Sequence, residues 1–112
     1  APVRALSSGA LQHRIIEARS LAMHCLAARK IDNNPELLAG VRGTLEKWRS
    51  RYGDETPRAL DEWAAILKRP WPEIAALITD AGERATCLRQ STPFAGVLSA
   101  EERERIYAAF RA

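Results

Sequence analysis

The spacing of apolar residues is the feature that most constrains this chain. They recur at intervals of three and four, and prolines interrupt the runs. The first two runs are Leu11, Ile15, Ala18, Ala22 and Cys25, then Leu38, Val41, Leu45, Trp48 and Tyr52. This period gathers side chains on one face of an α-helix, whereas a half-buried strand needs alternation, which no segment sustains. The pattern therefore predicts an all-α fold.

Start and stop signals divide the chain into helices. Asn34 and Thr56 each precede a proline, a pairing typical of an N-cap followed by the first helical position. Asp80-x-x-Glu83 and Ser99-x-x-Glu102 match the capping box. Together with the Pro70 and Pro72 break, these signals predict a compact bundle of about six helices over 9–30, 35–52, 57–68, 72–78, 80–90 and 100–110.

The length of 112 residues fits one domain. We expect residues 1–8 to form a flexible N-terminal arm and residues 9–112 a single helical domain with most aromatic side chains inside. Apolar runs are far shorter than the roughly 18 residues of a membrane span, and no secretory start is visible. Cys25 and Cys87 lack a paired-cysteine motif and are predicted to be buried free thiols. These observations favour a cytoplasmic protein without membrane contact.

Basic residues are concentrated in the first half of the chain. Residues 1–53 carry nine Lys and Arg against four Asp and Glu, and residues 54–112 carry eight against ten. The densest stretch gives a candidate face for a polyanion or an acidic partner, made of Arg42, Lys47, Arg49 and Arg51. Trp48 and Tyr52 belong to the apolar stripe of the same helix, so stacking on nucleic-acid bases is not expected.

Catalytic and metal-binding patterns are weak. His13, Glu17 and His24 lie on one helix face, but eleven residues separate the two histidines, a rise of roughly 16 Å. That distance prevents them from sharing one metal ion, and no nucleophile and base occur at a recognisable spacing. We therefore expect no metal, no cofactor and no enzymatic activity.

Residues 88–98 form the most distinctive stretch. It is predicted to be irregular, yet it carries Phe94, Val97 and Leu98 between turn-forming Pro93 and Gly96. Apolar residues in a loop either plug the core or form a binding surface. The core plug is favoured; in the other case, the candidate partner-binding residues are Trp71, Pro93, Phe94 and Val97.

The same stretch carries a resemblance. The sequence Leu-Arg-Gln-Ser-Thr-Pro-Phe-Ala-Gly-Val-Leu at 88–98, followed by Glu101-Glu102-Arg103, resembles a segment of small uncharacterised all-helical bacterial proteins. Residues 62–67 and 83–85 are similar to that group too. The group is similar in type to antitoxins and other partner proteins of two-gene systems, which implies binding rather than catalysis.

The functional prediction is a non-enzymatic protein–protein interaction module. Its narrower form is the antitoxin of a bacterial toxin–antitoxin pair, which occludes its cognate toxin through Phe94 or Trp71 and the basic face. If the toxin acts on nucleic acid or nucleotides, the acidic C-terminal half, with Asp61, Glu62, Glu101 and Glu102, is the alternative face. A homodimer is compatible with the long first helix. The alternative is a nucleic-acid-binding regulator that uses the basic N-terminal half.

Overall fold

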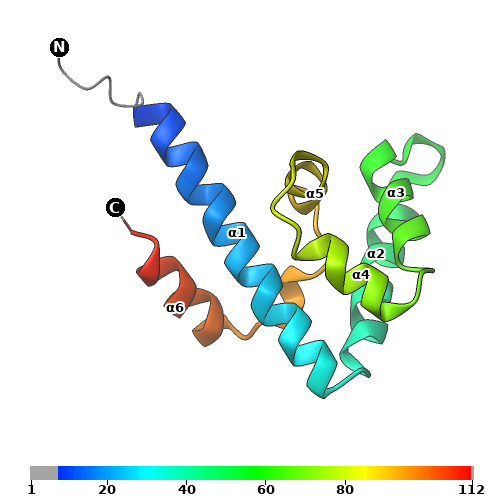
Figure 1. Ribbon diagram of the computed structural model, residues 1–112. Helices are drawn as coiled ribbons and strands as arrows, with labels where there is room; N and C mark the ends of the chain where they lie inside the picture. Colours follow the sequence, from blue (N-terminus) through cyan, green and yellow to red (C-terminus); the bar gives the residue numbers. More distant parts are fainter. Residues whose placement is uncertain (1–7, 112) are drawn as a thin grey trace, which may run out of the picture.

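One long helix, α1, Ser8–Asn33, organises the computed structural model, which describes residues 8–111 (Figure 1). Five further helices follow: α2 Leu37–Tyr52, α3 Arg58–Ile66, α4 Trp71–Ile78, α5 Glu83–Arg89 and α6 Ala100–Ala109. Short 3₁₀ turns lie at Gly53–Glu55 (η1) and Ala95–Val97 (η2), and the described residues contain no strand. The all-α prediction is confirmed. Residues 1–7 of the predicted arm lie outside the described residues, and Ser8 already belongs to α1.

The elements lie on two sides of α1. Helix α6 runs antiparallel to α1 along one side, and α2 to α5 lie on the other (Figure 1). Lys30 of α1 holds the start of α6: its Nζ donates to the Val97 carbonyl at 2.9 Å and lies 2.6 Å from Glu102 Oε1. The hydrogen bond from Lys30, together with one from the Ser99 backbone, lowers the pKa of Glu102 to about 2. Glu102 is therefore ionised at any ordinary pH, and this contact joins α6 to α1.

The predicted apolar stripe of α1 is not its buried face: Leu11, Ala18 and Cys25 are exposed, and Ile15 and Ala22 are half-buried. His24, Ala27, Ala28 and Ile31 are buried, whereas Cys25 is exposed. The sequence pattern was misleading because a histidine reads as polar, so the stripe was placed through Cys25 instead of His24. Cys87 is also a free, exposed thiol. The prediction that both thiols are buried is wrong.

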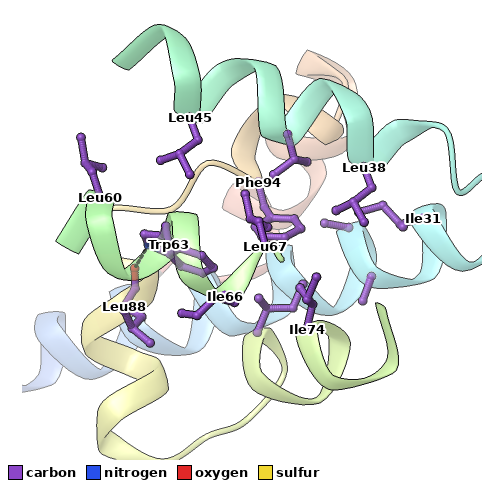
Figure 2. Packing of buried hydrophobic residues seen from close by; sticks show 14 of the residues in the cluster. Ile31, Leu38, Leu45, Leu60, Trp63, Ile66, Leu67, Ile74, Leu88 and Phe94 are labelled. Atoms are coloured by element: carbon purple, nitrogen blue, oxygen red, sulfur yellow. Dashed lines mark hydrogen bonds between the residues drawn. The ribbon is translucent and has the colours of Figure 1, made fainter. Parts of the chain in front are cut away.

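Phe94 lies at the centre of the core (Figure 2). Its ring centroid is 5.7 Å from that of Trp63 and 6.2 Å from that of His24, and both pairs are tilted. Trp63 is fully buried, and its indole Nε1 donates to the Leu88 carbonyl at 3.0 Å. A buried indole needs such a partner. The last turn of α5 is thus fixed to the core by the hydrogen bond at Leu88, and the loop that follows it is fixed by the ring of Phe94.

Of the four predicted capping signals, at Asn34, Thr56, Asp80 and Ser99, one is confirmed. Ser99 and Glu102 form the capping box of α6. Asn34 and Thr56 cap no helix. The N-cap positions of α2 and α3 are instead Glu36 and Pro57, which lie further along the chain. Asp80 Oδ1 instead accepts a hydrogen bond from the Gly82 amide at 2.9 Å. Asn, Asp and Thr favour turns as readily as helix caps. With proline, they therefore predicted where the helices are interrupted but not which residue caps the next helix.

Candidate partner-binding site

The basic residues of α2 do not form one free face. Arg42 donates through Nε and Nη2 to the Leu67 carbonyl, at 3.3 and 3.1 Å. Arg49 Nη2 lies 3.2 Å from Asp61 Oδ1 of α3. Both arginines therefore join α2 to α3. Lys47 and Arg51, one helical turn apart, are exposed and have no polar partner among residues 8–111.

A cleft opens beside Arg51, where three distant segments meet. It has a volume of about 590 Å³ and is open to solvent. The end of α2, the start of α3 and the chain after α5 form its walls; the lining residues are Trp48, Arg51, Tyr52, Pro57, Ala59, Leu60, Gln90, Ser91 and Thr92. Arg51 is the charged residue among them. The cleft thus combines an apolar and aromatic wall with a cation and an amide at its rim.

The turn at Gly53 shapes this cleft. Gly53 has φ of +58°, a conformation that side chains disfavour, and it ends α2 directly after Tyr52. The chain then reverses through η1 to Pro57 on the facing wall. As a result, the Tyr52 ring is 51% exposed and Trp48 is half-buried. The expectation that Tyr52 lies inside with the apolar stripe is wrong, because Tyr52 is the last residue of α2 and lines the open cleft.

A chain of hydrogen bonds fixes Thr92, which lines the cleft. His24 Nδ1 lies 2.7 Å from the Ser20 carbonyl, and Nε2 lies 2.7 Å from Thr92 Oγ1. A carbonyl only accepts, so Nδ1 carries the proton and the Thr92 hydroxyl donates to Nε2. Thr92 Oγ1 also accepts from the Phe94 amide at 3.0 Å. Every polar atom of the imidazole is therefore satisfied in the neutral form.

The environment of His24 keeps it neutral. Burial lowers the pKa of His24 to about 4, with a smaller opposing effect of the Ser20 hydrogen bond and a further lowering by the Arg89 guanidinium. The ring is 3% exposed. His24 thus holds Thr92 and Phe94 in place instead of exchanging protons with a ligand.

Arg89 is the second buried polar residue of the core region. Its Nη1 donates to the carbonyls of Ile78 and Asp80, at 3.1 and 2.6 Å, and its Nη2 donates to Thr86 Oγ1 at 3.2 Å. The Ile78 and Asp80 carbonyls lie at and just beyond the end of α4, where backbone acceptors lack helical partners. Arg89 therefore acts as a side-chain cap that joins α5 to α4.

The predicted partner anchors lie in different places. Phe94 is 1% exposed and Pro93 is fully buried, so neither reaches a partner on this surface. Val97 packs against the core, and half-buried Trp71 donates from Nε1 to Asp32 Oδ1 at 2.7 Å. The loop is the core plug that the sequence favoured, because Trp63 and His24 form a tight aromatic site for Phe94. The anchor role of Phe94 and Pro93 is wrong.

His13, Glu17 and His24 do not converge. His13 Nε2 lies 2.8 Å from Glu17 Oε1 on the exposed surface of α1, whereas His24 faces the core. Among residues 8–111, no group of three or more His, Cys, Asp or Glu could hold a metal ion.

The cleft could not be predicted from the sequence because its walls are far apart in the chain. Gln90 and Ser91 lie about forty positions from Tyr52, and no periodic pattern links them. The Tyr52-Gly53 pair was the available signal, since glycine is the usual residue directly after a helix end and so marks Tyr52 as the last residue of the helix.

Comparisons of the chain with protein-family models, with curated proteins and with solved structures gave no match. Within the described part, no helix is long and apolar enough to cross a membrane.

Proposed function

We propose that this chain is a non-enzymatic protein–protein interaction module, and that a segment of its partner lies in the cleft between α2, α3 and residues 90–92. One observation carries the proposal: half-exposed Tyr52 stands beside Arg51, whose side chain has no polar partner among residues 8–111, at a cleft of about 590 Å³. Aromatic and arginine side chains at a concave surface are the residue types that contribute most to protein interfaces.

The cleft chemistry defines the segment that it accepts. Trp48, Tyr52 and Pro57 offer an apolar wall for an aromatic, aliphatic or proline side chain. Arg51 is placed to pair with a carboxylate, and Lys47 lies on the same side of α2 one turn earlier. The amide of Gln90 is exposed and available to the partner's backbone. The expected segment is therefore extended, apolar and followed by Asp or Glu.

One observation makes nucleic acid the weaker alternative for the basic face of α2. Arg42 and Arg49 are engaged with α3, which leaves Lys47 and Arg51 of this face for phosphate contacts. Two phosphate contacts give a small salt-dependent affinity compared with the six to ten of typical DNA-binding proteins. Exposed Tyr52 adds one ring for base stacking, so single-stranded nucleic acid belongs in the test as a competing ligand.

The narrower form of the proposal is an antitoxin that acts in the cytoplasm. The partner would then be a toxin whose active-site segment enters the cleft and is occluded. Co-expression with the product of the adjacent gene tests this role. A complex that protects cells from the second protein, and is lost on Arg51→Glu, supports it; a chain that elutes alone contradicts it.

Selection from a random peptide library tests the general proposal. Peptides enriched on the wild-type chain are expected to combine an apolar residue with a nearby Asp or Glu. Their binding should fall about tenfold or more on Tyr52→Ala and on Arg51→Glu, because each change removes an anchor from the cleft. Arg69→Glu, at an exposed position outside the cleft lining, is the matched charge control and should bind as the wild type does.

Two results would overturn this proposal. One is the absence of enriched peptides, or enrichment of peptides that bind Tyr52→Ala equally well. The other is tight binding of a single-stranded oligonucleotide near about 100 mM salt that Arg51→Glu abolishes, which would favour the nucleic-acid alternative.

A further inference from the structure

The N-terminal half of α1 and helix α6 pack side by side as an antiparallel pair without a buried residue. Although the two helices are not consecutive in the chain, we call this pair the α1–α6 hairpin. Between Gly9 and Met23 every described side chain is exposed or half-buried, and α6 has no buried residue. Elsewhere in the fold each helix contributes at least two residues to the interior. The hairpin is therefore the part of the fold whose apolar face is left uncovered.

Apolar side chains gather in a groove along this hairpin. Leu11 is 49% exposed, Ile16 44% and Tyr107 41%; Ile15 and Phe110 are half-buried beside them. Together they line a groove of about 670 Å³ between the two helices. Three of the four large hydrophobic side chains that are exposed in the described part lie here. Such clustering marks an interaction surface rather than scattered exposure.

The shape of the molecule agrees with a missing layer. The radius of gyration is 15.6 Å, whereas a compact chain of this length has about 13 Å. In Figure 1 the hairpin extends away from α2 and α3, with the start of α1 and the end of α6 together at one end. Two helices cannot bury an apolar stripe by themselves, and the common solution is a bundle in which two hairpins face each other.

The charges along the groove decide the occupant. Arg19 and Arg111 line it together with Glu104, so the same surface carries both signs. The Arg19 guanidinium lies 4.2 Å from the centre of the Tyr107 ring. A two-fold axis places a surface opposite itself, and such a surface must be self-complementary. Because the groove carries both signs, a two-fold arrangement can place an arginine of one copy opposite Glu104 of the other, whereas a groove of one sign would repel its own copy.

We infer that the α1–α6 hairpin is a dimer interface, and that a second copy of this chain packs on it to give a four-helix bundle. This surface lies apart from the cleft at α2 and α3 and shares none of its lining residues. Each copy of the dimer therefore keeps its cleft open for a partner segment.

Sedimentation of the full chain under reducing conditions, from about 1 to about 500 µM, tests the inference. The wild type is expected to reach twice its 12.4 kDa mass. Leu11→Glu should raise the dimer dissociation constant about tenfold or more, because the change occurs twice in a two-fold interface. Ile16→Glu is the second variant. Ala39→Glu is the matched control, since Ala39 is exposed on α2 and lines neither the groove nor the cleft, and it should dimerise as the wild type does.

Circular dichroism of each variant separates dimerisation from folding. Both hairpin variants should keep the wild-type helical signal, because Leu11 and Ile16 are half-exposed. A wild-type chain that stays monomeric over the whole concentration range would overturn the inference. The occupant of the groove would then be another protein or residues 1–7, and not a second copy. A dimer whose dissociation constant is unchanged by both Leu11→Glu and Ile16→Glu would overturn the inference too.

Discussion

Replacing Thr92 by valine removes one hydroxyl from the centre of the core loop and keeps the side-chain shape. The hydroxyl donates to His24 Nε2 and accepts from the Phe94 amide, so the substitution leaves two polar groups without a partner. An unsatisfied buried group costs about 1–3 kcal/mol. Because Thr92 is half-buried and water reaches the cleft beside it, the low end applies to each group. We expect Thr92→Val to lower the free energy of unfolding by about 2 kcal/mol.

Urea unfolding followed by circular dichroism measures this loss. Thr92→Ser is the matched control, since it keeps the hydroxyl and should cost less than about 1 kcal/mol. In a His24→Leu background only the Phe94 amide still needs the hydroxyl, so Thr92→Val should cost about half as much there. Equal stability of the valine and serine variants would refute the reasoning. So would an unchanged cost of Thr92→Val in the His24→Leu background.

Three further predictions follow from the buried polar groups and from the Lys30 contact. His24 has a pKa of about 4 in the folded chain and about 6.5 when unfolded, so the unfolded state takes up the proton first and the stability from neutral His24 is lost as pH falls from about 6.5 to 4. The loss approaches ~3 kcal/mol, and urea unfolding across this range should show it for the wild type but not for His24→Phe. Arg89→Met, which removes the cap of α4, should cost about 2–4 kcal/mol in thermal or urea unfolding, whereas Arg84→Met at an exposed position should stay within about 0.5 kcal/mol; equal costs would contradict the capping role. Lys30→Met should speed amide hydrogen exchange in α6 and leave exchange in α2 unchanged, because Lys30 contacts Val97 and Glu102 at the start of α6. Equal increases in exchange throughout the protein would contradict a local role of Lys30 at α6.

Most of the fold was predictable from local pattern. The period of three and four located the helices, and proline marked the breaks between them, because both effects act within a few residues. The capping box at Ser99 was predictable for the same reason: its two hydrogen bonds lie within one turn. The caps expected at Asn34 and Thr56 failed because such residues also stabilise turns.

The buried face of α1 could not be read from hydrophobicity. His24 belongs to it only because Thr92, 68 positions later, provides a hydrogen-bond partner. Arg89 is also buried because of distant partners, since it donates to backbone carbonyls at and just beyond the end of α4. A buried polar residue depends on partners that tertiary structure supplies, and its own sequence neighbourhood contains no sign of them.

The candidate site was predictable in its residue types but not in its assembly. The basic and aromatic stretch of α2 was identified, yet which arginines remain free depends on the carbonyl of Leu67 and the carboxylate of Asp61 in and beyond α3. The loop at 88–98 was identified too, but its apolar residues face the core and its polar residues, Gln90 and Ser91, line the cleft. Sequence alone favoured a core plug for the apolar residues of the loop and offered them as partner anchors in the other case, but it did not single out Gln90 and Ser91.

Chemical-shift mapping tests the central claim most directly. A peptide selected on the wild-type chain is titrated into the ¹⁵N-labelled protein, and the amide shifts are followed residue by residue. The account predicts that the largest shifts fall on Tyr52, Gly53, Gln90 and Ser91, which border the cleft. Shifts confined to other surfaces, or an equal response in Tyr52→Ala, would contradict it.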